Sequence, residues 1–367
     1  MNQTKLDQLF KFLDIPSRPL VGIDVSPTSI KCVELTSSRS GELTIENYSI
    51  EPTPREAFSD QGIENTDLLG AAIERAWKRL GTKVKNIAIA MPSNVAIIKK
   101  VKFSMDLDEL AVAEEVLVEA SQFIPFPLDD VNLDWVVLGP HPNAPETDNE
   151  VLICATRRDR IVDYMAAGEA AGLKAIKVDI DTFAMQLAFD HLQSINEQYQ
   201  TEVIAVADAG SSTLNLSVYN KTDGQVFTKE IPYGSNQLTE NICAIYNISP
   251  EQANEAKRNG GQGLTDYFNQ AVEPFLEGLA VEINRSLQFF LTQAEVERID
   301  RIMLAGGCAA LQNAAEVVGR STQITTTIFN PFEGMEIASR LKNRNLEQEA
   351  PMLLTACGLA LRRFDDN

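Results

Sequence analysis

Two short segments, roughly half a chain apart, share one pattern and constrain the fold more than any other feature of this sequence. Residues 21–31 and residues 205–216 each contain an apolar run, one aspartate, a turn of small residues and a second β-prone run. Each segment therefore predicts a β-hairpin with a carboxylate beside a tight turn. Two such hairpins in one chain indicate a duplicated domain whose halves hold one nucleotide from both sides.

The turns of the two hairpins carry groups that suit phosphate. Backbone amides in a tight turn can cradle phosphate oxygens, and hydroxyl side chains can add donors. The residues that we expect to contact phosphate are Ser26, Thr28, Ser29, Gly210, Ser211 and Ser212. Pro27 removes one backbone donor and fixes φ, so the first turn is expected to hold phosphate less completely. Asp24 and Asp208 are placed to hold Mg²⁺, through water, between the protein and a phosphate chain.

A third segment, Met303–Leu311, predicts a strand that runs into the glycine pair Gly306-Gly307. Glycine pairs after a strand allow a close backbone approach to a flat ligand. Taken alone, the segment is typical of an ordinary strand-to-helix turn. Because it follows both hairpins in the order that a nucleotide site needs, we interpret it as the shelf for adenine and ribose.

In this order, the three segments resemble the phosphate-1, phosphate-2 and adenosine motifs of the actin, Hsp70 and sugar-kinase superfamily. Asp179–Ala184 and Pro351–Arg362 resemble its two connecting helices, the second with small residues where helices would pack closely. Ser121–Val131 and Leu133–Val136 are similar to a segment typical of the type IV pilus assembly protein PilM, a relative of the division protein FtsA. The resemblance extends from about Leu20 to Arg363.

The resemblance implies an α/β fold with two lobes: a duplicated, ribonuclease H-like, actin-like ATPase fold with an inserted FtsA-type subdomain 1C. The expected divisions are an N-terminal helix over 1–18, subdomain 1A over 19–84 and 159–200, 1C over 85–158, 2A over 201–235 and 300–367, and 2B over 236–299. The N-terminal helix is amphipathic, with a stripe of Leu6, Leu9, Phe10 and Leu13. It either packs on its own domain or lies on the inner membrane or a partner.

The resemblance also assigns two charged side chains. Lys31 stands where a lysine of the family can reach the phosphates, and a solvated strand lysine is the alternative. Asp181 stands where the superfamily often places a group that orients the attacking water, with Asp179 as the alternative. Because aspartate is one methylene shorter than glutamate, we expect ATP hydrolysis to be weak or absent.

Three further nucleotide contacts are carried over from the family. Gly234 belongs to a turn that resembles the GGxxxT motif, with Ser235 in place of its second glycine. Asn254 and Lys257 match the AExxK helix segment that touches the nucleoside. Asn254 replaces the usual glutamate there, so it could bond a ribose hydroxyl without a charge.

An apolar run suggests a surface for a partner. It comprises Phe123, Ile124, Pro125 and Phe126. It is either a helix end tucked into subdomain 1C or one wall of a partner groove. In the family, the groove between 1A and 1C takes the short cytoplasmic N-terminus of the inner-membrane protein PilN. A strand edge within residues 95–103 could pair with such an extended peptide.

Composition excludes several other functions. The formal net charge of −20 argues against binding of nucleic acid and against broad adhesion to anionic lipid. Five scattered cysteines without a CxxC pair indicate a reducing, cytoplasmic compartment. No apolar run is long enough to span a membrane, and no P-loop motif occurs. We therefore expect a cytoplasmic protein that is peripheral to the inner membrane through its partners.

Three functions remain open on these grounds. The first is an ATP- and Mg²⁺-binding scaffold of type IV pilus assembly that docks PilN and links the membrane proteins to the motor side. The second is a membrane-associated filament former like FtsA. The third is a small-molecule kinase of the same superfamily, for which the sequence shows no acceptor-binding motif.

Overall fold

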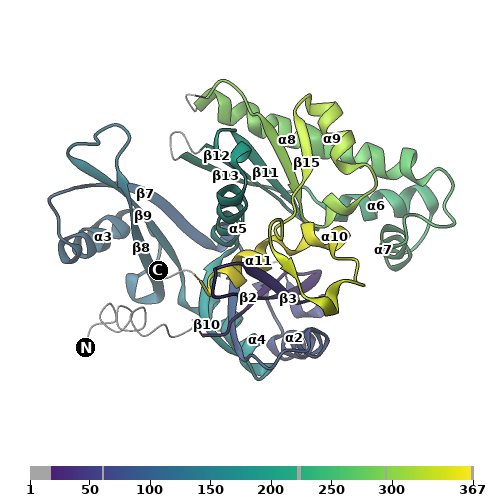
Figure 1. Ribbon diagram of the computed structural model, residues 1–367, viewed down its shortest axis with the longest axis horizontal. Coiled ribbons are helices and arrows are strands. Elements are labelled where there is room, and N and C mark those ends of the chain that lie inside the picture. Colours follow the sequence, from purple (N-terminus) through teal and green to yellow (C-terminus); the bar gives the residue numbers. More distant parts are fainter. Residues whose placement is uncertain (1–17, 60–61, 221–224, 294–295, 365–367) are drawn as a thin grey trace.

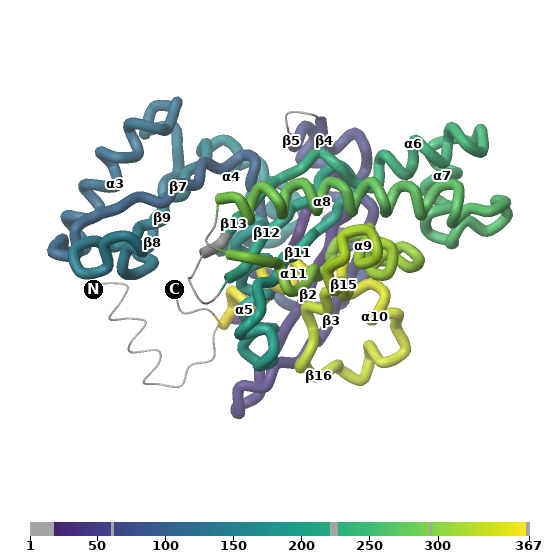
Figure 2. Tube along the Cα trace, turned by 90° about the horizontal axis from the view of Figure 1, so that it is seen from above, coloured from purple at the N-terminus to yellow at the C-terminus, as the bar shows by residue number. Residues whose placement is uncertain are grey.

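The computed structural model describes residues 18–59, 62–220, 225–293 and 296–364. Two β-sheets face each other across a layer of helices, and a smaller sheet projects from one end of the molecule (Figures 1 and 2). The expected N-terminal amphipathic helix lies outside the described residues.

The first sheet contains the first hairpin. Its strand order is β10-β6-β1-β2-β3-β16, with β1 and β2 antiparallel and β6 parallel to β1. One face packs against the helices α2 (Thr66–Leu80) and α4 (Arg158–Ala170) through an apolar core. The strands are β1 (Val21–Val25), β2 (Ser29–Ser37), β3 (Leu43–Pro52), β6 (Asn86–Met91), β10 (Lys174–Ile180) and β16 (Glu336–Ile337).

The second sheet repeats this arrangement. Its order is β13-β12-β11-β14-β15, with β11 and β12 as an antiparallel hairpin and β14 parallel to β11. The sequence β10-β6-β1-β2-β3 of the first sheet thus corresponds strand by strand to β15-β14-β11-β12-β13, which confirms the duplication predicted from the two hairpins. The strands are β11 (Ile204–Ala209), β12 (Leu214–Asn220), β13 (Gln225–Ile231), β14 (Arg301–Ala305) and β15 (Thr325–Ile328).

Two helices fill the space between the sheets. They are α5 (Asp181–Ile195) and α11 (Leu354–Leu361), and one apolar core joins them to strands of both sheets (Figure 1). The two helices touch almost backbone to backbone, because a Cβ on Gly358 would lie 1.8 Å from the Ala184 carbonyl oxygen. The small residues of the C-terminal segment therefore serve close helix packing, as predicted.

The expected division at residues 300–367 needs a correction. That segment was assigned entirely to the second lobe, but β16 pairs with β3 and α11 packs on β1 and β2 of the first sheet. The reason is that α11 is apolar on every side, and such a helix is buried rather than amphipathic. Helix α11 completes the apolar core between the two lobes, so this helix belongs to both lobes.

A separate small unit contains the three-stranded sheet β7-β9-β8 and the helix α3 (Glu109–Phe123), which covers one of its faces. The strands are β7 (Ala96–Ser104), β8 (Val131–Pro140) and β9 (Asp148–Arg157). The expected start of this unit at residue 85 is wrong, because Asn86–Met91 forms β6 in the first main sheet. A nearly continuous buried apolar run suits a parallel strand covered on both faces. The small unit therefore begins after Met91.

Residues 236–299 are mostly helical, as the sequence predicts, and together with α9 these helices cover one face of the second sheet. They are α6 (Ser235–Tyr246), α7 (Pro250–Arg258), a π-helical turn (Phe268–Val272), α8 (Glu273–Gln293) and α9 (Ala314–Thr322). The predicted break at 260–263 is present. Three of its residues, Gly260, Gly261 and Gly263, have positive φ angles. The remaining strands and α-helix of the described residues are β4 (Phe58–Ser59), β5 (Gly62–Ile63) and α10 (Leu346–Glu349).

Candidate functional site

The aspartate of the first hairpin is paired with a lysine. Asp24 and Lys31 face each other across β1 and β2, and the Lys31 Nζ lies 2.7 Å from Asp24 Oδ2. Both side chains are only 16% exposed, so Lys31 is not a solvated strand lysine. Burial lowers the pKa of Lys31, but Asp24 and then Asp208 outweigh it and leave that pKa raised. The ammonium is therefore held as a cation between carboxylates.

The aspartate of the second hairpin approaches the same lysine. Burial raises the pKa of Asp208 to about 6, Lys31 opposes this shift, and Asp24 adds to it. These electrostatic interactions connect a carboxylate from each lobe with one ammonium. The structure thus brings together the two aspartates and the lysine that were selected from separate parts of the sequence.

The glycine pair after β14 lies against the second aspartate. Gly306 has a φ of 80°, and a Cβ there would stand 2.4 Å from both Asp208 Oδ1 and the Ala209 carbonyl oxygen. The Gly306 amide donates to the Pro351 carbonyl at 2.8 Å. A Cβ on Gly307, in contrast, would have no atom within 4 Å. The first glycine is therefore required by the aspartate itself, whereas a side chain at the second would extend into open space.

The second hairpin turn is fixed from behind by α6. The carbonyl oxygens of Gly210 and Ser211 accept hydrogen bonds from the amides of Ser235 and Asn236, at 3.0 and 2.8 Å. In a trans peptide, a carbonyl and the following amide point in opposite directions. The amides of Ser211 and Ser212 therefore point away from α6, which is the orientation that the predicted phosphate contact needs.

The residues expected near the nucleoside gather where α6 begins. Lys257 Nζ donates to the Ser235 carbonyl at 3.2 Å, and Thr239 Oγ1 lies 3.4 Å from Asn254 Oδ1. Burial lowers the pKa of Lys257. A Cβ on Gly234 would lie 2.6 Å from the Ser211 carbonyl group, so this position also tolerates only glycine.

The first hairpin turn is closed by its own side chains. Ser26 Oγ donates to the Ser29 carbonyl at 2.9 Å and accepts from the Ser29 amide at 3.2 Å. Thr53 Oγ1 donates to the Ser26 carbonyl at 2.8 Å. Because the Ser26 hydroxyl proton is already committed, Ser26 shapes the turn, and the exposed Thr28 is the residue whose side chain is accessible.

The structure separates the two alternatives at the start of α5. Asp179 forms a 2.6 Å ion pair with Arg362. Asp181 Oδ1 instead accepts hydrogen bonds from the amides of Ser93 and Thr182, at 3.0 and 2.7 Å. Burial raises the pKa of Asp181 to about 7; the Thr182 amide opposes the shift, and Asp24 adds to it. Asp181 is therefore the carboxylate that faces the site.

This raised pKa predicts how stability depends on pH. An unfolded aspartate has a pKa of about 3.9, so between about pH 4 and 7 the folded protein binds more protons at Asp181 than the unfolded chain does. The Asp181 contribution to stability therefore falls as pH rises through this window. We expect Asp181→Asn to be more stable than the wild type by about 1–3 kcal/mol at pH 8 and nearly equal to it at pH 4. Urea denaturation at both pH values measures this, and an equal difference at the two values would contradict it.

Several residues of the site were not found from the sequence. Cys308 Sγ lies 3.4 Å from the Gly210 carbonyl and joins the glycine pair to the second turn. Its place directly after the glycines was a usable signal. Tyr164 on α4 has its pKa raised by burial and then by Asp24 and Asp181. Ser93 acts through its backbone amide, which no residue type reveals.

The apolar run expected to line a partner groove is only partly at the surface. Ile124 is 6% exposed and belongs to the core of the small unit, because it packs beneath β8 and β9. Phe126 is 40% exposed, and the Arg157 guanidinium lies 5.5 Å from its ring centroid. The predicted strand edge is present, since β7 pairs with β9 and with no other strand among the described residues. Phe126 and Pro125 therefore remain as candidate contacts.

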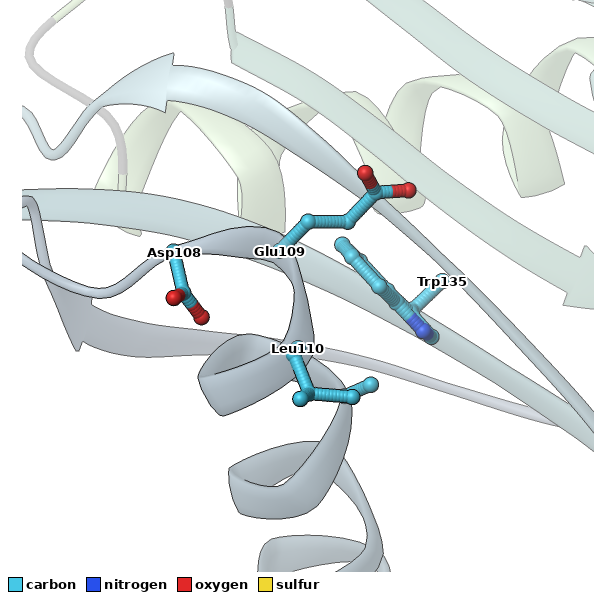
Figure 3. A pocket seen from close by; sticks show the side chains of 5 residues that line it. Asp108, Glu109, Leu110 and Trp135 are labelled. Carbon is cyan, nitrogen blue, oxygen red and sulfur yellow. The ribbon is translucent and has the colours of Figure 1, made fainter. Parts of the chain in front are cut away.

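A hollow of about 520 Å³ lies elsewhere on the small unit (Figure 3). It is lined by Asp108, Glu109, Leu110, Ala113 and Trp135, at the start of α3 and on β8. It is open and lies away from the aspartate pair. Within the part of the chain that the structure describes, no cluster of three metal-ligating side chains occurs, and no helix is long and apolar enough to cross a membrane.

Two sheets of matching strand order, with two helices between them and a turn aspartate from each sheet interacting with one lysine, define a protein of the actin-like ATPase fold. The sequence model of the type IV pilus assembly protein PilM matches residues 22–364. The chain therefore belongs to the PilM family.

Solved structures with the same fold are similar over nearly the whole chain. A PilM-PilN type IV pilus biogenesis complex contains a chain that is 23% identical, with a TM-score of 0.79 and coverage of 95% of this chain and 99% of that one. The ethanolamine utilization protein EutJ from Carboxydothermus hydrogenoformans is 14% identical, with a TM-score of 0.52 and coverage of 98% and 99%. A diol dehydratase-reactivating factor in nucleotide-free form is 10% identical, with a TM-score of 0.54 and coverage of 94% and 99%.

Proposed function

We propose that this protein is an ATP-binding scaffold of type IV pilus assembly. The proposal that the protein binds ATP rests on one observation, the convergence of Asp24, Lys31 and Asp208 beside Gly306. Two carboxylates and one ammonium, taken from both lobes, suit a ligand that brings both a divalent cation and phosphate groups. Membership of the PilM family supports the pilus part.

The residues fit Mg²⁺ held through water rather than by a cage of side chains. The described chain offers no group of three ligating side chains, and Mg²⁺ typically keeps several waters and binds through one or two carboxylates plus substrate phosphates. Asp24 and Asp208 supply these carboxylates. When bound, Mg²⁺ would neutralise phosphate charge and orient the phosphate chain.

Each side chain of the proposed nucleotide site then contacts a different part of the ligand. Lys31 moves its positive charge toward the phosphates, and the Ser211 and Ser212 amides donate to phosphate oxygens. Lys257 and Asn254 lie at the nucleoside end. Asp181 has its Oδ1 occupied by two amides, so only its second oxygen can orient a water molecule. Weak or absent hydrolysis follows from this short, tethered carboxylate.

We assign the small sheet and α3 to subdomain 1C, the first main sheet to 1A, the second to 2A and the helices between residues 236 and 299 to 2B. The neighbouring complex contains PilN bound to a PilM chain. By this likeness, the N-terminal cytoplasmic peptide of PilN is the proposed occupant of the groove between 1A and 1C, near Phe126. Such docking would hold the protein at the cytoplasmic face of the inner membrane.

Calorimetric titration tests this function. A synthetic peptide with the N-terminal sequence of PilN from the same organism is titrated into the protein with and without Mg-ATP, beside a scrambled peptide. We expect binding of the authentic peptide only, weakened about tenfold by Phe126→Ala, since a buried aromatic anchor typically contributes more than 1 kcal/mol. Leu110→Ala serves as the control, because Leu110 is an apolar residue of the small unit that is even more exposed than Phe126. Absence of binding in both nucleotide states would reject the scaffold role and favour a filament protein or a kinase.

A further inference from the structure

The turn that leads into the small sheet is bonded to the nucleotide cleft. After β6, the chain passes through Pro92 and the 3₁₀ turn η2 (Ser93–Val95) before β7 begins. The amide of Ser93 donates to Asp181 Oδ1 at 3.0 Å. The first residue of η2 is therefore held by Asp181, the carboxylate that interacts with Asp24 and Asp208.

The same turn touches the other lobe. Asn94 Nδ2 donates to Glu230 Oε1 on β13 at 3.2 Å. Across the second sheet, Glu230 pairs with Asn215, which in turn pairs with Asp208. One row of cross-strand neighbours in the second sheet thus runs from Asp208 to Glu230, the residue that accepts the hydrogen bond from the turn.

On its far side, the turn is fixed to the small sheet. Thr156 Oγ1 donates to the Val95 carbonyl at 3.0 Å, and Thr156 pairs with the next residue, Ala96, where β7 meets β9. Thr156 is buried, which protects this bond from water. A movement of the turn must therefore move the first residues of β7 and β9 together.

We propose that the turn Pro92–Val95 couples the nucleotide site to the small sheet, so that a ligand at either place changes the conformation of the other. A ligand that draws the two lobes together acts on Asp181 and on the row of Asp208 and Glu230, and both end at this turn. A bound partner on the small sheet acts on the cleft by the same contacts, because coupling between two sites is reciprocal. This inference rests on the proposed nucleotide site and adds the path of its regulation.

The contact between the turn and Asp181 can be removed by deleting a single hydrogen-bond donor, the Ser93 amide. Ser93→Pro deletes the amide hydrogen, and the fold accepts the ring for two reasons. Pro92 has ψ near 143°, the extended conformation required before a proline, and Ser93 is the first residue of its turn, where proline fits. Ser93→Ala is the matched control, since it retains the amide. Asn94→Ala cuts the contact with the second lobe separately.

Hydrogen–deuterium exchange of the full chain, with and without saturating Mg-ATP, measures the response. In the wild type and in Ser93→Ala, we expect nucleotide to slow exchange in β7 and β9 about fivefold or more, in the range of ordinary coupling energies. In Ser93→Pro, nucleotide still protects the cleft turns, but β7 and β9 lose most of this response. Asn94→Ala shows a smaller loss in the same strands.

The outcomes distinguish a failure of the proposed link from a failure of the proposed nucleotide site. If Ser93→Pro binds nucleotide and its small sheet responds as in the wild type, the link is rejected while the nucleotide site stands. If calorimetry finds no nucleotide binding to the wild-type protein, the site assignment fails and the link fails with it. Should Ser93→Pro unfold, the comparison of Asn94→Ala with the wild type decides, and an unchanged response there rejects the link.

Discussion

We expect Asp208→Ala to lose nearly all of its affinity for Mg-ATP and to remain folded. Asp208 lies at the end of β11, its carboxylate faces Lys31, and Gly306 packs directly against it. In the proposed site it supplies one of only two carboxylates for the cation. Removing one of two carboxylates weakens the attachment of the cation, and with it that of the phosphate chain, so we expect affinity to fall at least about 100-fold, which corresponds to about 2.8 kcal/mol.

The loss of binding is not accompanied by a loss of stability. Burial raises the pKa of Asp208 to about 6, which means that ionising this carboxyl costs more free energy in the folded protein than in the unfolded chain. Removing it relieves this cost, and Lys31 keeps its ion pair with Asp24. At pH 8 the variant should therefore be at least as stable as the wild type in urea denaturation.

Calorimetric titration with Mg-ATP measures the affinity, and Asp106→Ala, an exposed aspartate on the small unit, serves as the control. The control should bind nucleotide as the wild type does. Normal Mg-ATP binding by Asp208→Ala would show that the paired hairpins do not form the nucleotide site, whatever the fold.

The features that the sequence predicted best are those coded locally. The two hairpins and the glycine pair can be recognised from windows of about ten residues. The reason is that turn residues, glycines and the alternation of apolar and polar residues determine the conformation of their immediate neighbours. The lysine at position 31 needed the structure, since only the cross-strand register shows that it faces Asp24. Gly306 was selected from the sequence as a nucleotide contact, and the structure adds a different role, because its missing Cβ makes room for Asp208.

The errors all concern non-local pairing. Nothing within Asn86–Met91 says that its partners are β1 and β10 rather than the strands of the small unit, which follow directly. Ile124 belongs to an apolar run, but its burial depends on strands that come later in the chain. Ser93 was missed because its contribution is a backbone amide, which every residue except proline carries.

Gly306→Ala and Gly307→Ala are adjacent and chemically identical changes. We expect the first to lower stability and the second to lower the affinity for Mg-ATP. At position 306, the new methyl group meets Asp208 Oδ1 and the Ala209 carbonyl at 2.4 Å, and the backbone has a φ of 80° that alanine adopts poorly. Neither backbone nor carboxylate can move away freely. We expect Gly306→Ala to lose about 2 kcal/mol or more of stability, in the range of overpacked and strained positions.

At position 307, the methyl group meets no protein atom within 4 Å, and the φ angle lies outside the left-handed region. Stability should therefore stay within about 0.5 kcal/mol of the wild type. If Gly307 forms the shelf for adenine and ribose, the same methyl group stands against the ligand, so the affinity for Mg-ATP should fall about tenfold or more while the fold is untouched.

Urea denaturation and calorimetric titration of both variants make this comparison decisive. A stable Gly307→Ala that binds nucleotide weakly assigns the face above Gly307 to the ligand, because no protein contact can explain the loss. A Gly307→Ala that binds as tightly as the wild type removes this glycine from the site and leaves Gly306 with a purely structural role beside Asp208. The glycine pair would then serve the aspartate, and the nucleoside would have to lie closer to Lys257 and Asn254.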